Sequence, residues 1–355
     1  MRTPLLPSKI FMRPFAVLCL FCFLTETSCT QQTPVAAAKP ADVQPPAYKS
    51  WAVGDTSDVR TKPLGGTVLM GGSTDVDNAM RWLLQRTDGG DVVVLRATGA
   101  DGYNQYLFDL QKVNSVETFL VNSRELANNA AIERKIRNAE AVFIAGGDQA
   151  NYINFWKNTK VEDALNYLIN TKKVVVGGTS AGCGVLGGVY FAALSGTVRS
   201  EEALADPYDG RVVIQKDDFL NNPLLVNVVA DMHYDNPDRR GRQLVFMARM
   251  AKDFGVAQPR GIGVDEKTAV CVDLTGKALV FGEGNAYFLE ASAPPEVCEP
   301  QKRLGWVQKR KAVSVCMLTG SANGENTFDL PTWRPVKTTS PQRHWYVENG
   351  VLKEE

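Results

Sequence analysis

The chain has 355 residues, of which 44% are hydrophobic and 22% charged, a composition that indicates a folded soluble protein and excludes a fibrous or disordered one. Lys and Arg together number 39, as do Asp and Glu, so no net basic charge indicates nucleic acid or an anionic membrane surface as the main partner. Only two histidines are present, His233 and His344, which is too few for a multi-histidine metal site. We therefore expect neither a metal nor an organic cofactor, and any imidazole base has two candidates.

The N-terminus has the layout of an export signal. Three basic residues precede an apolar run at 15–24, which is too short to span a bilayer. We therefore predict a signal peptide at 1–28 and an exported protein that is secreted, periplasmic or lipid-anchored to the cell envelope. Cys29 follows directly and is the candidate lipid-modified residue, although Glu26 departs from the usual apolar pattern; simple secretion is the alternative.

The pattern of a folded domain begins after a second special segment. Residues 29–50 are rich in Pro, Ala and Gln without an apolar period, which predicts a flexible tether. From about residue 65, short β-rich runs alternate with segments of helical spacing, and this alternation predicts an α/β fold with a parallel sheet and helices on both faces. The expected strands lie at 67–71, 91–95, 116–121, 141–145 and 173–177, and the expected helices at 75–86, 123–137 and 161–171.

A second block, residues 228–289, is expected to complete the same domain. It contains one strand, a helix at 239–254 and two apolar runs at 269–281 whose connecting turn indicates a hairpin. We therefore predict a single α/β domain over 51–330, followed by a peripheral tail at 331–355.

Four cysteines lie beyond the signal and the candidate lipid site: Cys183, Cys271, Cys298 and Cys316. So few in a domain of this length do not form a disulfide framework. A single Cys298–Cys316 disulfide and free buried thiols are left as alternatives, and no C-x-x-C pair indicates zinc.

Glycine-rich turns follow three of the expected strands, and the turn at 177–182 is the most informative. Ligands bind at the carboxyl ends of parallel strands, where such turns lie. Gly178 to Gly182 has the G-x-S-x-G pattern of a nucleophile elbow, in which Ser180 occupies a strained turn and the N–H of Ala181 faces the oxyanion. The turn at 146–148 would supply a second N–H, from Gly147 or Asp148. A phosphate-binding loop is the alternative, but no Walker lysine follows Ser180 and no G-x-G-x-x-G is formed.

A serine nucleophile requires a base, and His233 is the better placed of the two histidines. It follows an apolar strand and is close to Asp231 in the sequence, whereas His344 lies in the tail. The acid that would orient the imidazole is left open by position alone. The candidates are Glu201, Glu202, Asp206 and Asp231.

Five linked motifs over roughly residues 65–290 resemble cyanophycinase and its relatives in the S51 serine peptidases. They are Gly-Gly-Asp-Gln at 146–149, Gly-Gly-Thr-Ser-Ala-Gly at 177–182, Ser-Glu-Glu-Ala at 200–203, Asp-Met-His at 231–233 with arginines beyond, and Gly-Ile-Gly-Val-Asp-Glu-Lys-Thr-Ala at 261–269. The resemblance implies a flavodoxin-like sheet related to class I glutamine amidotransferases. It also implies hydrolysis of peptide bonds that involve aspartyl residues, including the β-aspartyl-arginine links of cyanophycin.

The same resemblance implies roles for individual residues. Ser180 would be the nucleophile and His233 the base, and the Ser-Glu segment would supply the acid, for which we favour Glu201 over Glu202. Gln149 would contact substrate from the oxyanion turn.

The stretch around the histidine departs from the family pattern at two positions. Met232 stands where cyanophycinases have Gln, and Pro237 replaces the first of three arginines, while Arg239 and Arg242 remain. We expect these two arginines and Asp231 to bind substrate, with weaker recognition of the polymer because one donor and one amide are lost.

The sequence thus predicts a serine-type exopeptidase of the S51 type that cleaves aspartyl or β-aspartyl peptide bonds through Ser180, His233 and Glu201. Its expected partner is a peptide, an acidic dipeptide or an acidic polymer, without nucleic acid, and a homodimer is left open. Two alternatives remain. One is an amidase or glutamine amidotransferase-like enzyme that uses Cys183, and the other is a non-catalytic envelope lipoprotein with the same fold.

Overall fold

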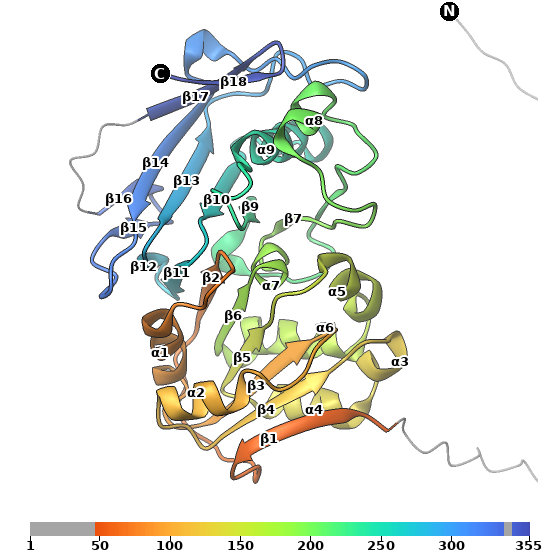
Figure 1. Ribbon diagram of the computed structural model, residues 1–355, viewed down its shortest axis with the longest axis vertical. Helices are drawn as coiled ribbons and strands as arrows, with labels where there is room; N and C mark the ends of the chain where they lie inside the picture. Colours follow the sequence, from red (N-terminus) through yellow and green to blue (C-terminus); the bar gives the residue numbers. More distant parts are fainter. Residues whose placement is uncertain (1–46, 337–342) are drawn as a thin grey trace, which may run out of the picture. The chain divides into compact units, whose positions relative to one another are not determined.

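Five buried strands form the parallel part of a first sheet (Figure 1). The computed structural model describes residues 47–336 and 343–355, so the predicted signal peptide, Cys29 and the predicted tether up to residue 46 lie outside the described residues. The five strands stand in the order β4-β3-β5-β6-β2, and each pair of neighbours is parallel. They confirm the five predicted strands and are β2 (Gly66–Met70), β3 (Asp91–Arg96), β4 (Ser115–Leu120), β5 (Ala141–Ile144) and β6 (Val175–Thr179).

Helices cover both faces of this parallel sheet, as predicted. Met80 of α1 packs in one apolar cluster with Val68 and Val92, whereas Ile136 of α4 belongs to the cluster on the opposite face with Val93. The alternation of Val92 and Val93 between the two clusters follows from the two-residue period of a strand. The helices of this half are α1 (Asp77–Gln85), α2 (Asn104–Leu110), α3 (Arg124–Ala127), α4 (Ala130–Asn138), α5 (Gln149–Trp156) and α6 (Lys160–Tyr167), which a π-helical turn (Leu168–Lys172) extends.

Antiparallel strands extend both edges of the first sheet. At one edge β1 (Lys49–Gly54) pairs with β4, although the tether was predicted to reach residue 50. None of the β1 side chains is fully buried, so no apolar run in the sequence marked this strand. At the other edge β11 (Thr268–Asp273) pairs with β2 and turns into β12 (Lys277–Gly282), which confirms the predicted hairpin. The short strands β15 (Thr327–Asp329) and β16 (Arg334–Pro335) follow beyond β12.

The described residues also form an eight-stranded second sheet, which was not predicted. Its strand order is β18-β17-β14-β13-β10-β9-β7-β8, and β9 is parallel to both β10 and β7. Its elements are β7 (Val189–Phe191), α8 (Ser200–Ala205), β8 (Ile214–Lys216), β9 (Val228–Asp231), α9 (Arg240–Phe254), β10 (Arg260–Val264), β13 (Asn285–Ala291), β14 (Val313–Thr319), β17 (Arg343–Glu348) and β18 (Val351–Glu354), with short 3-10 turns at Pro223–Leu225 and Gln308–Arg310.

The C-terminal segment contributes to the core of this second sheet rather than forming a peripheral tail at 331–355. Strand β17 pairs with β14 on one side and β18 on the other. Trp345 is 2% exposed and Val347 is completely buried. The prediction of a peripheral tail was wrong because the segment contains many charged residues and prolines. Only a few of its side chains, such as Trp345 and Val347, are buried and pack against the core.

The two sheets share one apolar core, and this brings their strand ends together. Val176 of β6 lies in the same buried cluster as Ala230 of β9, Ile262 of β10 and Phe288 of β13. The short helix α7 (Ala181–Gly184) contacts both β6 and β9. The carboxyl ends of strands from different sheets therefore meet beside α7.

The cysteines of the described part of the chain are free thiols. Cys183, Cys271 and Cys298 are buried and Cys316 is partly exposed, so the Cys298–Cys316 disulfide left open by the sequence is not formed. None of the helices in the described ranges is long and apolar enough to cross a membrane.

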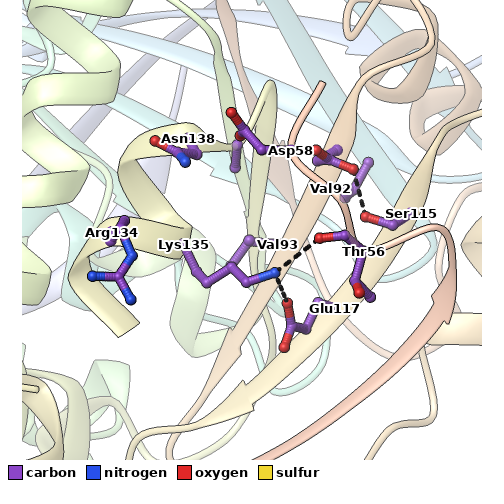
Figure 2. Close-up of a pocket in the computed structure, with 11 residues that line it drawn as sticks. Thr56, Asp58, Val92, Val93, Ser115, Glu117, Arg134, Lys135 and Asn138 are labelled. Carbon is purple, nitrogen blue, oxygen red and sulfur yellow. Dashed lines mark hydrogen bonds and ion pairs between the residues drawn. The ribbon is translucent and has the colours of Figure 1, made fainter. Parts of the chain in front are cut away.

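A cavity of about 220 Å³ lies at the amino ends of β3 and β4, at the opposite end of the parallel strands from the elbow of Ser180 (Figure 2). The Lys135 ammonium donates to the Thr56 carbonyl at 3.2 Å and pairs with Glu117 at 3.1 Å. Ser115 Oγ donates to Asp91 Oδ1 at 2.6 Å in the same cavity. These contacts join α4 and the segment after β1 to the amino ends of β3 and β4.

Candidate active site

Ser180 occupies a strained turn between β6 and α7. Its backbone has φ 51° and ψ −122°, a conformation that residues other than glycine rarely adopt, and its N–H donates to the Met70 carbonyl at 3.0 Å. Close packing requires both glycines of the pattern. A Cβ at Gly178 would lie 2.4 Å from the backbone of Gly182, and one at Gly182 would lie 2.1 Å from the carbonyl oxygen of Ile144. The turn therefore has the geometry of a nucleophile elbow.

The imidazole of His233 faces the hydroxyl of Ser180. The distance from His233 Nε2 to Ser180 Oγ is 2.8 Å. His233 follows the end of β9, where its φ is 47° and its N–H donates to the carbonyl of Gly71 at 2.8 Å. The structure thus places the two residues that the sequence singled out within hydrogen-bonding distance, one from each sheet.

The carboxylate that reaches the other imidazole nitrogen belongs to Glu266. Its Oε1 lies 2.6 Å from His233 Nδ1, and its backbone N–H donates to Asp235 Oδ1 at 3.0 Å. Glu266 stands in the short link between β10 of the second sheet and β11 of the first. Glu266 lies in the 261–269 motif, just after the end of β10. This position at a strand end is the sequence feature that could have identified it as a candidate acid.

The acid predicted from the sequence, Glu201, is not brought to His233. Glu201 is exposed on α8, and its carboxylate has no hydrogen bond or ion pair among the described residues. Its neighbour Glu202 accepts the N–H of Arg199 at 2.9 Å and pairs with Arg211 at 3.0 Å. The Ser-Glu segment begins a surface helix, so the expectation of Glu201 beside His233 is corrected: the carboxylate within hydrogen-bonding distance of the imidazole is that of Glu266.

Gly72 leaves the space that the His233 ring occupies. Its φ is 103°, and a Cβ there would lie 2.5 Å from both Cε1 and Nε2 of the ring. We expect Gly72→Ala to displace the imidazole and to lower kcat/KM for peptide hydrolysis about 100-fold, because a shift of about 1 Å in a catalytic group can have that effect. Gly89→Ala is the control for positive φ alone, since Gly89 has φ 79° and a Cβ added there would meet no atom within 4 Å. Equal kcat/KM values for the two variants would contradict the prediction.

Backbone N–H groups border Ser180 on two sides, from the residues that the sequence predicted for the oxyanion hole. Gly147, Asp148 and Ala181 line the cleft beside Ser180, and their N–H groups have no acceptor within the described part of the chain. Ala181 begins α7, where an N–H has no intrahelical acceptor. A Cβ at Gly146 would lie 3.3 Å from Ser180 Cβ, so the 146–148 turn abuts the nucleophile. The arrangement can stabilise a developing oxyanion.

A cleft of about 440 Å³ opens beside Ser180. Arg239 lines this cleft, and part of its guanidinium makes no hydrogen bond among the described residues. Arg239 Nη1 donates to the Met232 carbonyl at 3.0 Å, while its Nε is buried without a partner in the described ranges. Burial, with a smaller effect from Arg242, lowers the pKa of Arg239 from its ordinary value. Its Nη2 group also has no hydrogen-bond partner among the described residues, and a partly exposed guanidinium with this donor can bind a carboxylate.

Asp231 and Arg242, which we predicted to bind substrate, are engaged with each other. Both residues are 2% exposed. Arg242 donates from Nε to Asp231 Oδ2 at 2.8 Å and from Nη2 to Oδ1, and its Nη1 reaches Thr197 Oγ1 at 3.1 Å. The first turn of α9 folds Arg242 back onto the end of β9, so the pair supports the cleft wall and its donors to Asp231 are engaged within the protein.

Gln149 also has a structural contact that its sequence position did not indicate. It borders the cleft and is 8% exposed, but its Nε2 donates to the carbonyl of Phe191. This hydrogen bond ties the first turn of α5 to β7. One donor of the Gln149 amide is therefore engaged within the protein, and the nearby cleft wall is apolar, from Phe191, Leu194 and Met232.

Cys183 and His344 lie apart from these groups. Cys183 is completely buried, and burial raises the pKa of its thiol far above the ordinary value, so the nucleophilic thiolate is disfavoured. His344 lies on β17, opposite Ser314 of β14, and does not line the cleft. The Cys183 alternative therefore has no support in the geometry.

The family model of peptidase family S51 matches residues 103–279. The chain belongs to peptidase family S51. The matched part contains Ser180, His233 and Glu266, whereas Gly72 lies before it. The glycine that makes room for the imidazole of this S51 protein is thus outside the matched region.

Cyanophycinases are among the curated relatives of this S51 protein. The cyanophycinase of Nostoc sp. is 24% identical over 194 residues, which cover 55% of this chain and 59% of that protein. The cyanophycinase of Synechococcus elongatus is 25% identical over 178 residues, or 50% of each chain. The chain thus spans little more than half the length of the curated relatives it matches. Among solved structures, a peptidase from an acI-B1 Actinobacterium has 13% identity and a TM-score of 0.47, covering 76% of this chain and 98% of its own.

Proposed function

We propose that this S51 protein is a serine-type exopeptidase that hydrolyses aspartyl or β-aspartyl peptide bonds through Ser180, His233 and Glu266. The observation that carries the proposal is the continuous chain of two hydrogen-bonding distances, 2.8 Å from Ser180 Oγ to His233 Nε2 and 2.6 Å from His233 Nδ1 to Glu266 Oε1. A serine at a strained elbow, a base within reach and an acid that orients the base are the three parts of a catalytic triad.

The proposed reaction is acyl transfer to Ser180 followed by hydrolysis. Ser180 Oγ attacks the scissile carbonyl carbon while His233 Nε2 takes its proton, and Glu266 stabilises the imidazolium through Nδ1–H. The N–H groups of Ala181 and of Gly147 or Asp148 bind the oxyanion, and each is expected to contribute about 3 kcal/mol to transition-state stabilisation. His233 then protonates the leaving amine. Water, deprotonated by the same imidazole, releases the acyl group from Ser180.

The charges around the cleft support an acidic acyl residue. Asp231 lies between two guanidiniums, bonded to Arg242 and 3.9 Å from Arg239 Nη1, so this cluster carries one net positive charge. A substrate carboxylate at Arg239 would neutralise it. A single available guanidinium and the neighbouring Met232 favour small aspartyl peptides over a polymer with many charged side chains. The curated relatives are named cyanophycinases, and this name supports aspartyl links in the substrate but not the preference for small peptides.

A panel of dipeptides tests this proposal. We expect the purified protein to cleave Asp-Leu, β-Asp-Leu or β-Asp-Arg about 10- to 100-fold faster than Ala-Leu, since a charge-assisted pair contributes about 1.5–3 kcal/mol. Release of the free amine from each dipeptide gives the rates, and soluble cyanophycin in the same assay compares polymer with dipeptide. Cleavage of Ala-Leu as fast as the aspartyl peptides would contradict the substrate class, and the absence of any cleavage would contradict the activity.

Arg239→Met is expected to remove the preference for an acidic residue. We expect the ratio of kcat/KM for Asp-Leu over Asn-Leu to fall about 100-fold, because only the charged substrate loses a partner. Arg240→Met is the matched control, since Arg240 pairs with Asp238 and Glu354 at the surface and does not line the cleft. An unchanged ratio in Arg239→Met would exclude this residue as the carboxylate-binding group.

A further inference from the structure

We propose that Tyr152 is a positioning residue that aims the N–H of Gly147 at the oxyanion; the role rests on the proposed serine peptidase function. Tyr152 lies on α5, and its hydroxyl is 2.6 Å from the carbonyl oxygen of Ala145 and 3.2 Å from that of Gly146. Both carbonyls belong to the turn that follows β5 and abuts Ser180. The side chain does not touch the cleft itself.

The geometry of the peptide bond links this contact to the oxyanion hole. The carbonyl of Gly146 and the N–H of Gly147 belong to one planar trans peptide, in which they point in opposite directions. A hydroxyl that holds the carbonyl on the α5 side therefore orients the N–H away from α5. The hydroxyl shares its single proton between the nearer Ala145 carbonyl and the Gly146 carbonyl, and its share at Gly146 polarises this peptide and strengthens its N–H as a donor. The turn lies between β5 and α5, and in the described part of the chain no backbone hydrogen bond holds the N–H of Gly147.

The ring of Tyr152 is itself rigidly held. Tyr152 is 1% exposed, and its ring centroid lies 4.4 Å from that of Trp156, one turn further along α5. The indole Nε1 of Trp156 donates to the Val121 carbonyl at 2.9 Å, which anchors the pair to the end of β4. Burial raises the pKa of Tyr152 above its ordinary value, so the hydroxyl stays protonated as a donor. A fixed donor can thus set the direction of the 146–147 peptide.

The test compares Tyr152→Phe with Tyr190→Phe. Both substitutions remove one hydroxyl from a tyrosine that is 1% exposed, but the Tyr190 hydroxyl bonds to Gln215 and Asp218 instead of the turn. We expect Tyr152→Phe to lower kcat about tenfold with little change in KM, which corresponds to about 1.4 kcal/mol of transition-state stabilisation. The rate of Ser180 labelling by a fluorophosphonate should fall by a similar factor, while Tyr190→Phe leaves both rates near those of the unmodified chain.

These measurements separate the positioning role from a general loss of stability and from the function itself. Thermal unfolding of both variants shows whether each keeps its fold, and the split between kcat and KM would not follow from destabilisation alone. Labelling that is equally fast in Tyr152→Phe and the unmodified chain would overturn the role of Tyr152. So would equal losses of rate in the two variants. Absence of labelling in the unmodified chain would instead overturn the serine hydrolase proposal on which the role rests.

Discussion

Ser180→Ala is expected to reduce kcat for aspartyl dipeptides about 10⁶-fold without unfolding the protein. The substitution removes the attacking oxygen, and losses of this size are typical when the nucleophile of a serine peptidase is removed. The fold should persist because alanine keeps the Cβ and the N–H of residue 180 still donates to the Met70 carbonyl. Among the described residues, the hydroxyl bonds only to His233. Single-turnover hydrolysis and circular dichroism measure the two effects.

Cys183→Ala is the matched control for the nucleophile, three residues further along the same elbow. Its thiol is completely buried, so we expect hydrolysis near the rate of the unmodified chain. A fluorophosphonate should label the protein, and the label should disappear in Ser180→Ala alone. Loss of activity in Cys183→Ala with activity retained in Ser180→Ala would favour the amidase alternative. A failure to label any form would favour the non-catalytic lipoprotein.

Local patterns in the sequence were sufficient to locate Ser180 and His233 and to predict the parallel strands. The G-x-S-x-G spacing depends on close backbone contacts within a few residues, such as the packing of Gly178 on Gly182. Because both glycines lie in the same short segment, the sequence pattern alone indicates this turn. Strands β2 to β6 are buried on both faces, and β3 and β5 in particular are continuous apolar runs, which is the simplest strand signal. Each of these features needs no knowledge of where distant segments lie.

The residues that the sequence misplaced depend on how the two sheets meet. Glu266 is 33 positions beyond His233 and reaches it only because the link from β10 to β11 crosses between the sheets. Arg242 was expected to bind substrate, and it does border the cleft, but the direction of α9 turns its guanidinium onto Asp231, which a helical period cannot reveal. β1 and β17 were missed because they pair with strands far away in the sequence, at Ser115–Leu120 and Val313–Val315. Long-range register, rather than composition, decided these cases.

Glu266→Gln is expected to lower kcat about 10⁴-fold while the fold and KM change little. The carboxylate accepts Nδ1–H of His233 and thereby leaves Nε2 without a proton, ready to accept one from Ser180. An amide whose N–H faces Nδ1 selects the opposite tautomer, and a substitution of this type in a serine triad has an effect of about 10⁴ in kcat. Glu266→Asp should retain a carboxylate, although the shorter side chain places it farther from His233 Nδ1, and we therefore expect a smaller loss of kcat. Steady-state hydrolysis of Asp-Leu across a range of pH measures all three forms.

Glu201→Gln is the control that separates the two candidate acids. Glu201 is exposed and its carboxylate has no hydrogen bond or ion pair in the described part of the chain, so we expect kcat within about twofold of the unmodified chain. The variant with the larger loss of kcat identifies the acid of the triad, because only the carboxylate that contacts Nδ1 can control the tautomer of His233. A large loss in Glu201→Gln with full activity in Glu266→Gln would contradict the geometry. It would require α8 to move toward the cleft when substrate binds, with Glu201 replacing Glu266 at the imidazole.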